Sequence, residues 1–242
     1  INAIYDGGIK ATDAYFAGIF SYLEENGLLE NTAVIIMSDH GEELGERGVV
    51  GMHAHSLHRE ILHVPLIIRA PGLKPLRIGS RERLVDISPT ALDLLGVAYR
   101  RAQFQGRSAV PLLSGRRAPD TPVFSERERE SQAQEQIKLK SLISGNWKLI
   151  TPTAETPFSK LLSRIPFGLI YPVKDKELYD LSADQGEKRN LALRYLSRTR
   201  AMDTAIRRAI ERNESRALPK AKPYATPENN GLRQLKDLGY IR

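Results

Sequence analysis

The sequence predicts an α/β protein in two parts. Residues 1–118 alternate helical patterns with short, β-branched apolar runs, which is typical of a three-layer α/β/α arrangement around a mostly parallel sheet. Residues 119–242 contain several short strand patterns followed by a long helical one, which indicates a small antiparallel α+β subdomain. A chain of 242 residues has room for one sizeable domain and such an appendage.

Two apolar runs predict the strands of the first part. The runs 32–38 and 64–69 are short and rich in valine and isoleucine, so we expect both strands to be covered on both faces. A helical pattern over 2–26, ended by Gly27, precedes them. The polar stretch 42–60 between them is punctuated by glycines, and we expect a long functional loop with one helical turn at most.

A second helix is expected after the second strand. Residues 84–87 have the pattern of a short extended piece. Ser88 then suits an N-cap, because the proline that follows it fits the first position of a helix. We expect this helix to cover 91–95 and to end at Gly96.

The second part shows four strand patterns, separated by turns and loops. They lie at 121–125, 136–143, 147–150 and 177–181. Gly145 and Asn146 predict a hairpin turn between the second and the third. Residues 126–136 are expected to form an exposed loop, and helices are expected over 186–212 and 232–238.

The composition narrows the classes of function. No stretch approaches the ~18–20 apolar residues that span a bilayer, and the absence of cysteine excludes disulfides and thiolate metal sites within this sequence. The formal charge is +7, but the basic residues of 188–216 alternate with acidic ones rather than with aromatic residues. We therefore expect a solvated helix face and no nucleic-acid partner. The cellular compartment stays open.

The chemistry is expected where the first strand ends, at Asp39 and His40. A carboxylate and an imidazole at the end of a strand suit a divalent cation, with further ligands arriving from elsewhere. All five histidines lie in one short window: His40, His53, His55, His58 and His63. The alternative is that Asp39 caps a turn and the histidines decorate a loop. Spacing alone leaves both interpretations open.

Several motifs, in their order along the chain, resemble the C-terminal portion of sulfatases, a family of the alkaline-phosphatase-like superfamily. The first is Ser38-Asp39-His40-Gly41-Glu42, followed by the Gly-x-His-x-His-Ser-Leu run of 51–57 and the strand 64–69. Further matches lie at 85–96, 104–115, 177–191 and 238–240. The resemblance implies part of the family's α/β core over 1–118 and its C-terminal subdomain over 119–242.

The resemblance also implies a role for each candidate residue. Asp39 and His40 match the pair that holds the metal in sulfatases, with Ca²⁺ expected first and Mn²⁺, Mg²⁺ or Zn²⁺ as alternatives. His53 is the best match to the basic side chain that contacts the sulfate, and His55 is the second choice. Either could donate to a non-bridging oxygen or protonate the leaving oxygen. His58 and His63 are expected to be loop or packing histidines.

Two departures from the family pattern stand out. Where the family often has a Tyr-Glu pair after Ser-Leu, this chain has His58-Arg59, followed by Glu60. The nucleophile of the family is a formylglycine made from Cys or Ser in a C-x-P-S-R type motif, and nothing in this sequence matches that motif. We therefore expect the nucleophile and the remaining metal ligands to lie upstream, in an N-terminal half that this sequence lacks.

The expected function is the hydrolysis of a sulfate ester of a small molecule or a glycan. A phosphonate-monoester or phosphodiester hydrolase, or a phosphoethanolamine transferase, of the same superfamily is the alternative, since these relatives share the Asp-His pair. A non-catalytic binding or assembly module is a second alternative. The chain alone is expected to be inactive, its partner is expected to be the missing half, and a membrane anchor is expected only if it lies upstream.

Overall fold

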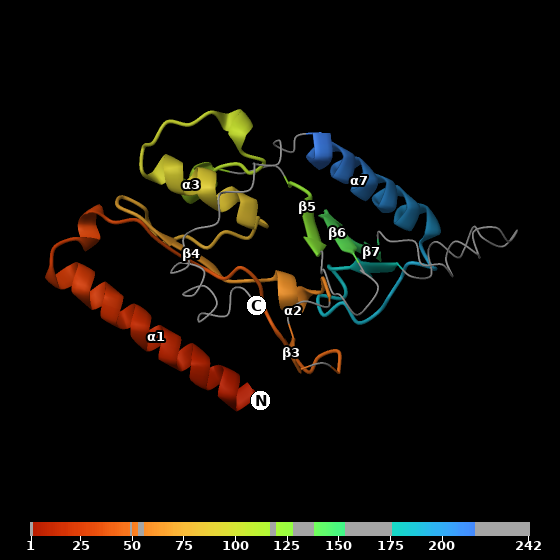
Figure 1. Cartoon of the computed structure of the whole chain (residues 1–242), viewed down its shortest axis with the longest axis horizontal. Helices are drawn as coiled ribbons and strands as arrows, with labels where there is room; N and C mark the ends of the chain where they lie inside the picture. Colours follow the sequence, from red (N-terminus) through yellow and green to blue (C-terminus); the bar gives the residue numbers. More distant parts are fainter. Residues whose placement is uncertain are drawn as a thin grey trace, which may run out of the picture. The chain divides into compact units, whose positions relative to one another are not determined.

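The computed structural model describes residues 2–48, 50–52, 56–116, 120–127, 138–152 and 176–215 (Figure 1). The chain divides into two compact units, Ile1–Ile206 and Arg207–Arg242. The described residues of the second unit are the last turns of one helix. None of the described helices has the length and apolar character that a bilayer span requires. The predicted boundary between 118 and 119 stays a prediction.

The first element is helix α1, Asn2–Glu25, and its end is fixed by Gly27. Gly27 adopts a φ of 64°. Its amide donates to the carbonyl of Glu24, and the amide of Leu28 donates to the carbonyl of Leu23 over 2.8 Å. These two bonds form the Schellman motif that a left-handed glycine permits. The predicted helix and its glycine stop are confirmed, and a 3-10 turn, Leu29–Asn31, leads to the first strand.

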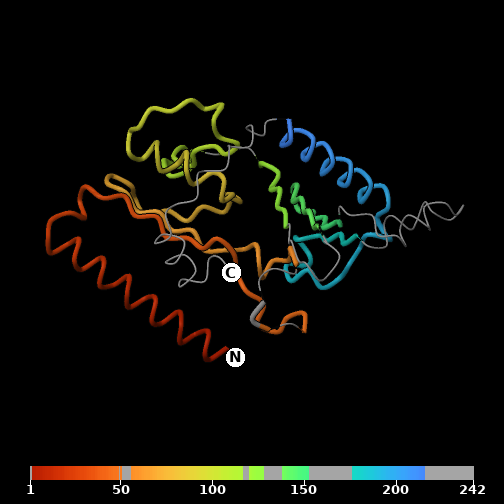
Figure 2. The backbone as a smooth tube through the Cα atoms, in the orientation of Figure 1, coloured from red at the N-terminus to blue at the C-terminus, as the bar shows by residue number. Residues whose placement is uncertain are grey.

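The two predicted strands of the first part are present as β1, Val34–Met37, and β4, Leu66–Arg69, and they pair with each other. Their relative direction differs from the prediction. The two strands lie side by side (Figures 1 and 2). They run antiparallel, with Ile35 opposite Ile68. Every paired strand among the described residues is antiparallel, so the mostly parallel sheet expected for 1–118 is corrected. An apolar, β-branched run suits either direction, and the direction is decided by the return path of the chain.

Neither strand is covered on both faces by the described residues. Met37 is 38% exposed and Ile67 is 59% exposed. The expectation of two-sided burial is therefore wrong for this pair. A guanidinium fixes the ladder at its end instead, because Arg69 donates to the carbonyl of Leu29 over 2.6 Å and to that of Thr32 over 3.3 Å.

The stretch expected to be a long loop contains regular structure. Strands β2, Glu43–Leu44, and β3, Val50–Met52, form a short antiparallel hairpin, and helix α2, Arg59–Leu62, supplies one helical turn. The single turn was predicted and the hairpin was not. A two-residue strand carries too short an alternation of polar and apolar residues to be recognised in a sequence.

A second helical region follows β4. A 3-10 turn, Leu84–Asp86, leads directly into helix α3, Ile87–Leu94, and Asp86 is the N-cap residue, so the prediction of an extended piece and of Ser88 as the cap is wrong. The Asp86 side chain makes no hydrogen bond to the helix, and its buried carboxylate instead accepts from the amides of Arg83 and Arg107 and from the Arg83 guanidinium. Burial alone would raise its pKa, but these donors hold the pKa of Asp86 below its usual value.

The segments that follow α3 pack closely upon it. A 3-10 turn, Arg101–Gln103, precedes the short helix α4, Val110–Leu113. Gly106 lies against the chain at Val85, where a Cβ atom would come within 1.8 Å of the carbonyl oxygen. Only glycine fits this approach. Gly96, at a φ of 67°, ends α3 as predicted.

The second part forms the predicted antiparallel sheet. Its strands are β5, Val123–Arg127; β6, Leu139–Ser144; β7, Trp147–Pro152; and β8, Glu177–Asp180, in that order across the sheet. Ser144 pairs with Trp147, so Gly145 and Asn146 form the predicted two-residue turn. Leu149 and Leu178 are fully buried partners on neighbouring strands. Most of the loop expected at 126–136, and the last predicted helix, lie outside the described residues.

Helix α7, Leu196–Ser215, begins ten residues later than predicted. The residues before it form turns around Glu187 and Asn190, whose side chains bind backbone groups of neighbouring segments. Its first turns pack on β7, with the Arg198 guanidinium 4.3 Å above the Trp147 ring. Thr199 and Ile206 are buried. In the sequence, the helical pattern already begins at residue 186. In the structure, the side-chain contacts of Glu187 and Asn190 hold the preceding residues in turns, so the helix begins only at Leu196.

Candidate active site

The candidate metal pair lies in the turn that ends β1. The Asp39 carboxylate accepts the backbone amide of His40 over 2.9 Å, and His40 Nε2 lies 3.7 Å from Asp39 Oδ2. Both side chains face solvent, at 84% exposure for Asp39 and 44% for His40. The sequence prediction that these two groups stand together is confirmed in position, and their role as ligands stays a prediction.

Hydrogen bonds orient this turn. The Ser38 hydroxyl donates to the carbonyl of His40 over 2.7 Å. His40 Nδ1 lies 3.0 Å from the carbonyl oxygen of Gly41. A carbonyl oxygen only accepts, so this contact requires the hydrogen on Nδ1 and makes Nε2 the nitrogen with the lone pair in the neutral ring. A histidine that binds a metal commonly donates its other ring hydrogen in this way.

Gly41 ties the turn to helix α2. Its amide donates to the carbonyl of Ile61 over 2.8 Å. A Cβ atom at Gly41 would lie 2.0 Å from the carbonyl oxygen of Glu60, so no other residue fits this position without moving the backbone. The place of Asp39 and His40 is therefore set by where α2 lies.

The two donor groups suit a divalent cation but do not complete a site. Carboxylate oxygen and imidazole nitrogen are both common ligands, and two atoms that each bind one Ca²⁺ at about 2.3–2.6 Å can lie up to roughly 5 Å apart. The 3.7 Å between Oδ2 and Nε2 falls within that limit. Within the described ranges, no cluster of three or more His, Asp or Glu side chains is suited to hold a metal ion.

The two candidate catalytic histidines, His53 and His55, lie outside the described residues. The chain just after them is anchored by a buried bond, because the Ser56 hydroxyl donates to Oε1 of Glu43 over 2.7 Å. Glu43 is fully buried and Leu57 is 3% exposed. The hairpin that begins at Glu43 and the Ser-Leu element that follows the histidines are thus joined.

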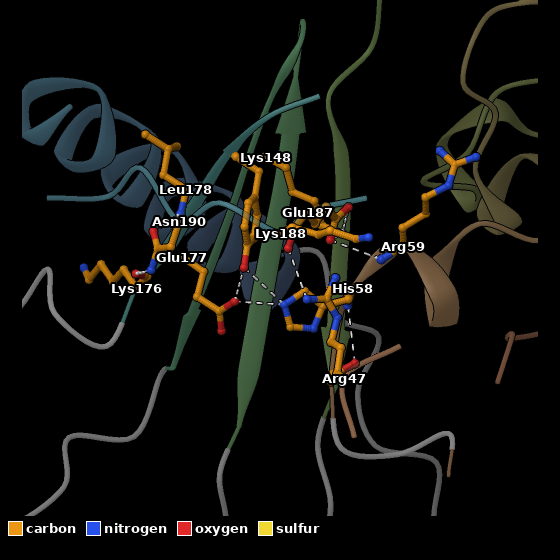
Figure 3. Close-up of polar contacts among 12 residues, drawn as sticks. Arg47, His58, Arg59, Lys148, Lys176, Glu177, Leu178, Glu187, Lys188 and Asn190 are labelled. Carbon is orange, nitrogen blue, oxygen red and sulfur yellow. Dashed lines mark hydrogen bonds and ion pairs between the residues drawn. The ribbon is translucent and has the colours of Figure 1, made fainter. Parts of the chain in front are cut away.

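A cluster of four charged side chains anchors the residues that follow Leu57, at the start of α2. We call it the buried charge cluster. It consists of Arg47, Lys148 and Glu187, which Figure 3 labels, together with Glu60. Lys148 Nζ donates to both carboxylate oxygens of Glu187, over 2.7 and 2.9 Å. Arg47 donates to the carbonyl of Glu187 over 3.1 Å and lies 3.4 Å from the Glu60 carboxylate. The two positive and two negative charges balance.

Burial dominates the electrostatics of the Lys148–Glu187 pair, whereas the Arg47 and Glu60 side chains are 21% and 14% exposed. Lys148 is 1% exposed and Glu187 is 3% exposed. Burial lowers the pKa of Lys148, while the adjacent Glu187 carboxylate acts in the opposite direction. Glu187 also adopts a φ of 51°, which is uncommon for a residue with a side chain. Its carboxylate is placed by the tertiary contacts rather than by a relaxed backbone.

His58 belongs to a separate, partly buried contact, as expected for a packing histidine. Its Nε2 lies 2.8 Å from Oε2 of Glu177, and the Tyr179 hydroxyl donates to the same carboxylate. The hydrogen bond from His58 lowers the pKa of Glu177, and burial opposes it. Residues of β8 thus bind Nε2 of His58, while Nδ1 is buried without a hydrogen-bond partner among the described residues. His63 is exposed, although partial burial and the Arg59 charge lower its pKa.

Sequence reasoning missed the buried charge cluster. One signal was present, because Lys148 stands inside the apolar run Trp147-Lys148-Leu149-Ile150. A lysine in a buried strand needs a carboxylate partner. The identity of that partner was beyond the sequence, because Glu187 follows β8 in a loop.

Comparison with known proteins identifies the family. The Sulfatase family model matches residues 3–97. Arylsulfatase K of Bos taurus is 29% identical over 211 residues, and arylsulfatase K of Rattus norvegicus is 30% identical over 219 residues. Each alignment covers 87% of this chain but 36% and 35% of the relative. The chain thus spans about a third of the length of these curated relatives.

Solved structures show the same relationship in the fold. A phosphonate monoester hydrolase from Silicibacter pomeroyi matches with a TM-score of 0.64 at 24% identity, over 85% of this chain and 39% of its own. A 2-O GAG sulfatase matches with a TM-score of 0.60 at 25% identity, over 79% of this chain and 39% of its own. Residues 3–97 thus match the Sulfatase family, and most of the chain is similar to part of arylsulfatase K.

Proposed function

We propose that this chain is part of an enzyme that hydrolyses sulfate esters, with Asp39 and His40 as two ligands of a divalent cation. The observation that carries the proposal is the exposed pair at the end of β1, whose carboxylate and imidazole atoms lie 3.7 Å apart. Both groups are tied to α2 through Gly41 and remain open to solvent on their outer side. Such a pair is suited to a ligand and contributes little to packing.

We assign one group of residues to binding the cation and another to contacting the sulfate. The cation, Ca²⁺ first, would polarise a sulfate oxygen and lower the pKa of the nucleophile. Asp39 and His40 hold it, and the carbonyl of Gly41 keeps the imidazole in the tautomer that presents Nε2. His53 is proposed to contact the sulfate, with His55 as the second choice. The nucleophile is proposed to be a formylglycine outside this sequence, which holds no matching motif.

The proposed substrate is a sulfated small molecule or glycan. This class is supported by the names of the relatives, which include arylsulfatase K and a 2-O GAG sulfatase. A further structure of similar fold, with a TM-score of 0.63 at 24% identity, is of a protein in complex with its substrate D-glucosamine-2-N,6-O-disulfate. That likeness extends to the fold alone.

Substitution of the pair tests the proposal. In the enzyme that contains this chain, Asp39→Asn and His40→Ala are expected to lower the release of 4-nitrophenol from 4-nitrophenyl sulfate by at least about 10³-fold. The fold should remain, because both side chains are exposed. His63→Gln is the matched control, since His63 is also exposed and is assigned no role. Activity in the two variants close to that of the control would refute the metal role.

A second substitution series assigns the sulfate contact. His53→Ala is expected to lower kcat/KM by about 10²–10⁴-fold, as the loss of an acid or an electrostatic donor does. If His53→Ala keeps full activity and His55→Ala loses it, the role moves to His55. If both variants keep full activity, neither histidine contacts the sulfate.

The choice of substrate separates this proposal from its alternative. Release of 4-nitrophenol from bis(4-nitrophenyl) phosphate or from a phosphonate monoester at a higher kcat/KM than from the sulfate ester would favour the phosphoryl-transfer relatives. A protein that binds no cation and turns over none of these esters would be a non-catalytic module.

A further inference from the structure

We propose that Glu187, held by Lys148, is a positioning residue for the Asp39–His40 turn and acts on it through helix α2. The inference rests on the proposed function for its consequence, which is the affinity for the cation. Its mechanism rests on contacts between described residues. Three consecutive links join the buried ion pair of the antiparallel sheet to the candidate metal pair, and each is a hydrogen bond or a close backbone contact.

The first link is the ion pair itself. Lys148 projects from the middle of β7, and its ammonium group reaches both oxygens of Glu187 (Figure 3). With exposures of 1% and 3%, neither side chain has an alternative partner in solvent. The carboxylate therefore has one orientation, which the rigid strand β7 determines.

The second link runs from that carboxylate to α2. Oε2 of Glu187 accepts the backbone amide of Arg59, the first residue of the helix, over 3.1 Å. Arg47 strengthens this link, because it donates to the carbonyls of Gly186 and Glu187 and pairs with Glu60 of the same helix. The buried charge cluster thus holds α2 by both its backbone and a side chain.

The third link joins α2 to the metal pair. Gly41 donates its amide to the carbonyl of Ile61, and its α-carbon lies so close to the carbonyl of Glu60 that no Cβ atom would fit. The carbonyl of the same Gly41 contacts His40 Nδ1. A displacement of α2 therefore changes the place of the turn and the orientation of the imidazole together.

The chemistry of the cluster favours a positioning role over a purely stabilising one. A buried ion pair commonly contributes no more stability than a well-packed apolar pair of similar volume. It does impose a defined geometry, because Oε1 receives Lys148 while Oε2 receives both Lys148 and the amide of Arg59. An apolar pair could fill the same space but could not hold that amide.

The test measures the turn and the cation separately. In Glu187→Gln, we expect hydrogen exchange of the Gly41 amide to accelerate by at least about tenfold. We expect half-maximal broadening of the His40 ring signals to require about ten times more Mn²⁺. The loss of a residue that positions a metal ligand typically weakens metal binding by such a factor. Lys148→Met/Glu187→Met is the second variant, because its apolar pair restores stability without restoring the acceptor of the Arg59 amide.

The matched control is the ion pair of Lys176 with Asp203, whose charged atoms lie 2.7 Å apart at exposures of 10% and 15%. It ties the residue before β8 to α7 and is not one of the links between Glu187 and α2. Lys176→Met/Asp203→Met is expected to change the melting temperature and to leave Gly41 exchange and the Mn²⁺ response as in the unaltered protein.

The outcomes separate this inference from the proposed function. If either Glu187 variant changes the melting temperature but leaves Gly41 exchange unchanged, the positioning role is overturned. If Mn²⁺ does not broaden the His40 signals of the unaltered protein, or broadens them equally in Asp39→Ala, the proposed cation site fails, while the exchange of Gly41 still decides the positioning role. Faster exchange and a weaker Mn²⁺ response in both Glu187 variants, but not in the control, support both.

Discussion

Among the described residues, two histidine–carboxylate pairs differ in burial, in spacing and in the number of protein partners. His58 and Glu177 lie 2.8 Å apart, with the histidine side chain 11% exposed and a tyrosine hydroxyl on the same carboxylate. His40 and Asp39 lie 3.7 Å apart, and both side chains face solvent. The first pair joins two segments that are far apart in the sequence, and the second joins neighbours within one turn.

This difference separates a packing contact from a ligand site. In the first pair, Oε2 of the carboxylate accepts from two protein donors, and the histidine that binds it is 11% exposed. In the second, the backbone orients the side chains while their outer faces remain accessible. Histidine and carboxylate at close range are therefore informative only together with burial and the number of protein partners.

The largest expected effect on stability comes from the buried Lys148–Glu187 ion pair, which is compared with the exposed Asp39. Glu187→Ala removes the partner of the buried Lys148 ammonium and should lower the free energy of unfolding by about 3–5 kcal/mol, because an unpaired charge remains inside the protein. Asp39→Ala removes an exposed carboxylate and should change it by less than about 0.5 kcal/mol. Urea unfolding curves measure both. Equal effects would erase the distinction between the two regions.

The second effect tests the contact that connects the regions. Gly41→Ala should lower the free energy of unfolding by about 3 kcal/mol, since its Cβ would lie 2.0 Å from a backbone oxygen of α2. Gly7→Ala is the control, because it lies within α1 with open space around it. That change should stabilise the helix by about 0.5–1 kcal/mol. Thermal unfolding followed by circular dichroism should give shifts of opposite sign.

The third effect compares the two histidines directly. His58→Ala should lower the free energy of unfolding by about 1–2 kcal/mol, because it removes a partly buried hydrogen bond to a carboxylate. His40→Ala should change it by less than about 0.5 kcal/mol. The order of the two effects on activity should be the reverse. A larger loss of stability in His40→Ala would show that the exposed turn also holds the fold.

The smallest expected effect is a dependence on pH. The hydrogen bond from His58 lowers the pKa of Glu177 below its ordinary value of 4.5, so the stability from this contact is present above that value and is lost as the pH falls through the lowered pKa. Between about pH 5 and pH 3, unfolding curves of the unaltered protein should lose more stability than those of His58→Phe. A steeper loss in the variant would contradict the assignment.

Local signals in the sequence were sufficient for much of the fold. Gly27 and Gly96 end their helices where predicted, because a left-handed stop depends on one residue without a side chain. The hairpin at Gly145 was predicted for the same reason. The start of α7 and the cap at Asp86 were not, because both are set by hydrogen bonds to segments elsewhere in the chain.

The sequence by itself determined that Asp39 and His40 stand together after a strand, since neighbours in a turn need no distant partner to meet. It also determined the antiparallel sheet of the second part, through alternation and a two-residue turn. Only the tertiary structure decided that β1 and β4 run antiparallel, that His58 belongs to β8, and that Lys148 meets Glu187. These three contacts depend on how the chain runs between residues that are distant in the sequence. The pattern of apolar and polar residues indicates the type of an element and its buried face, but it does not indicate that path.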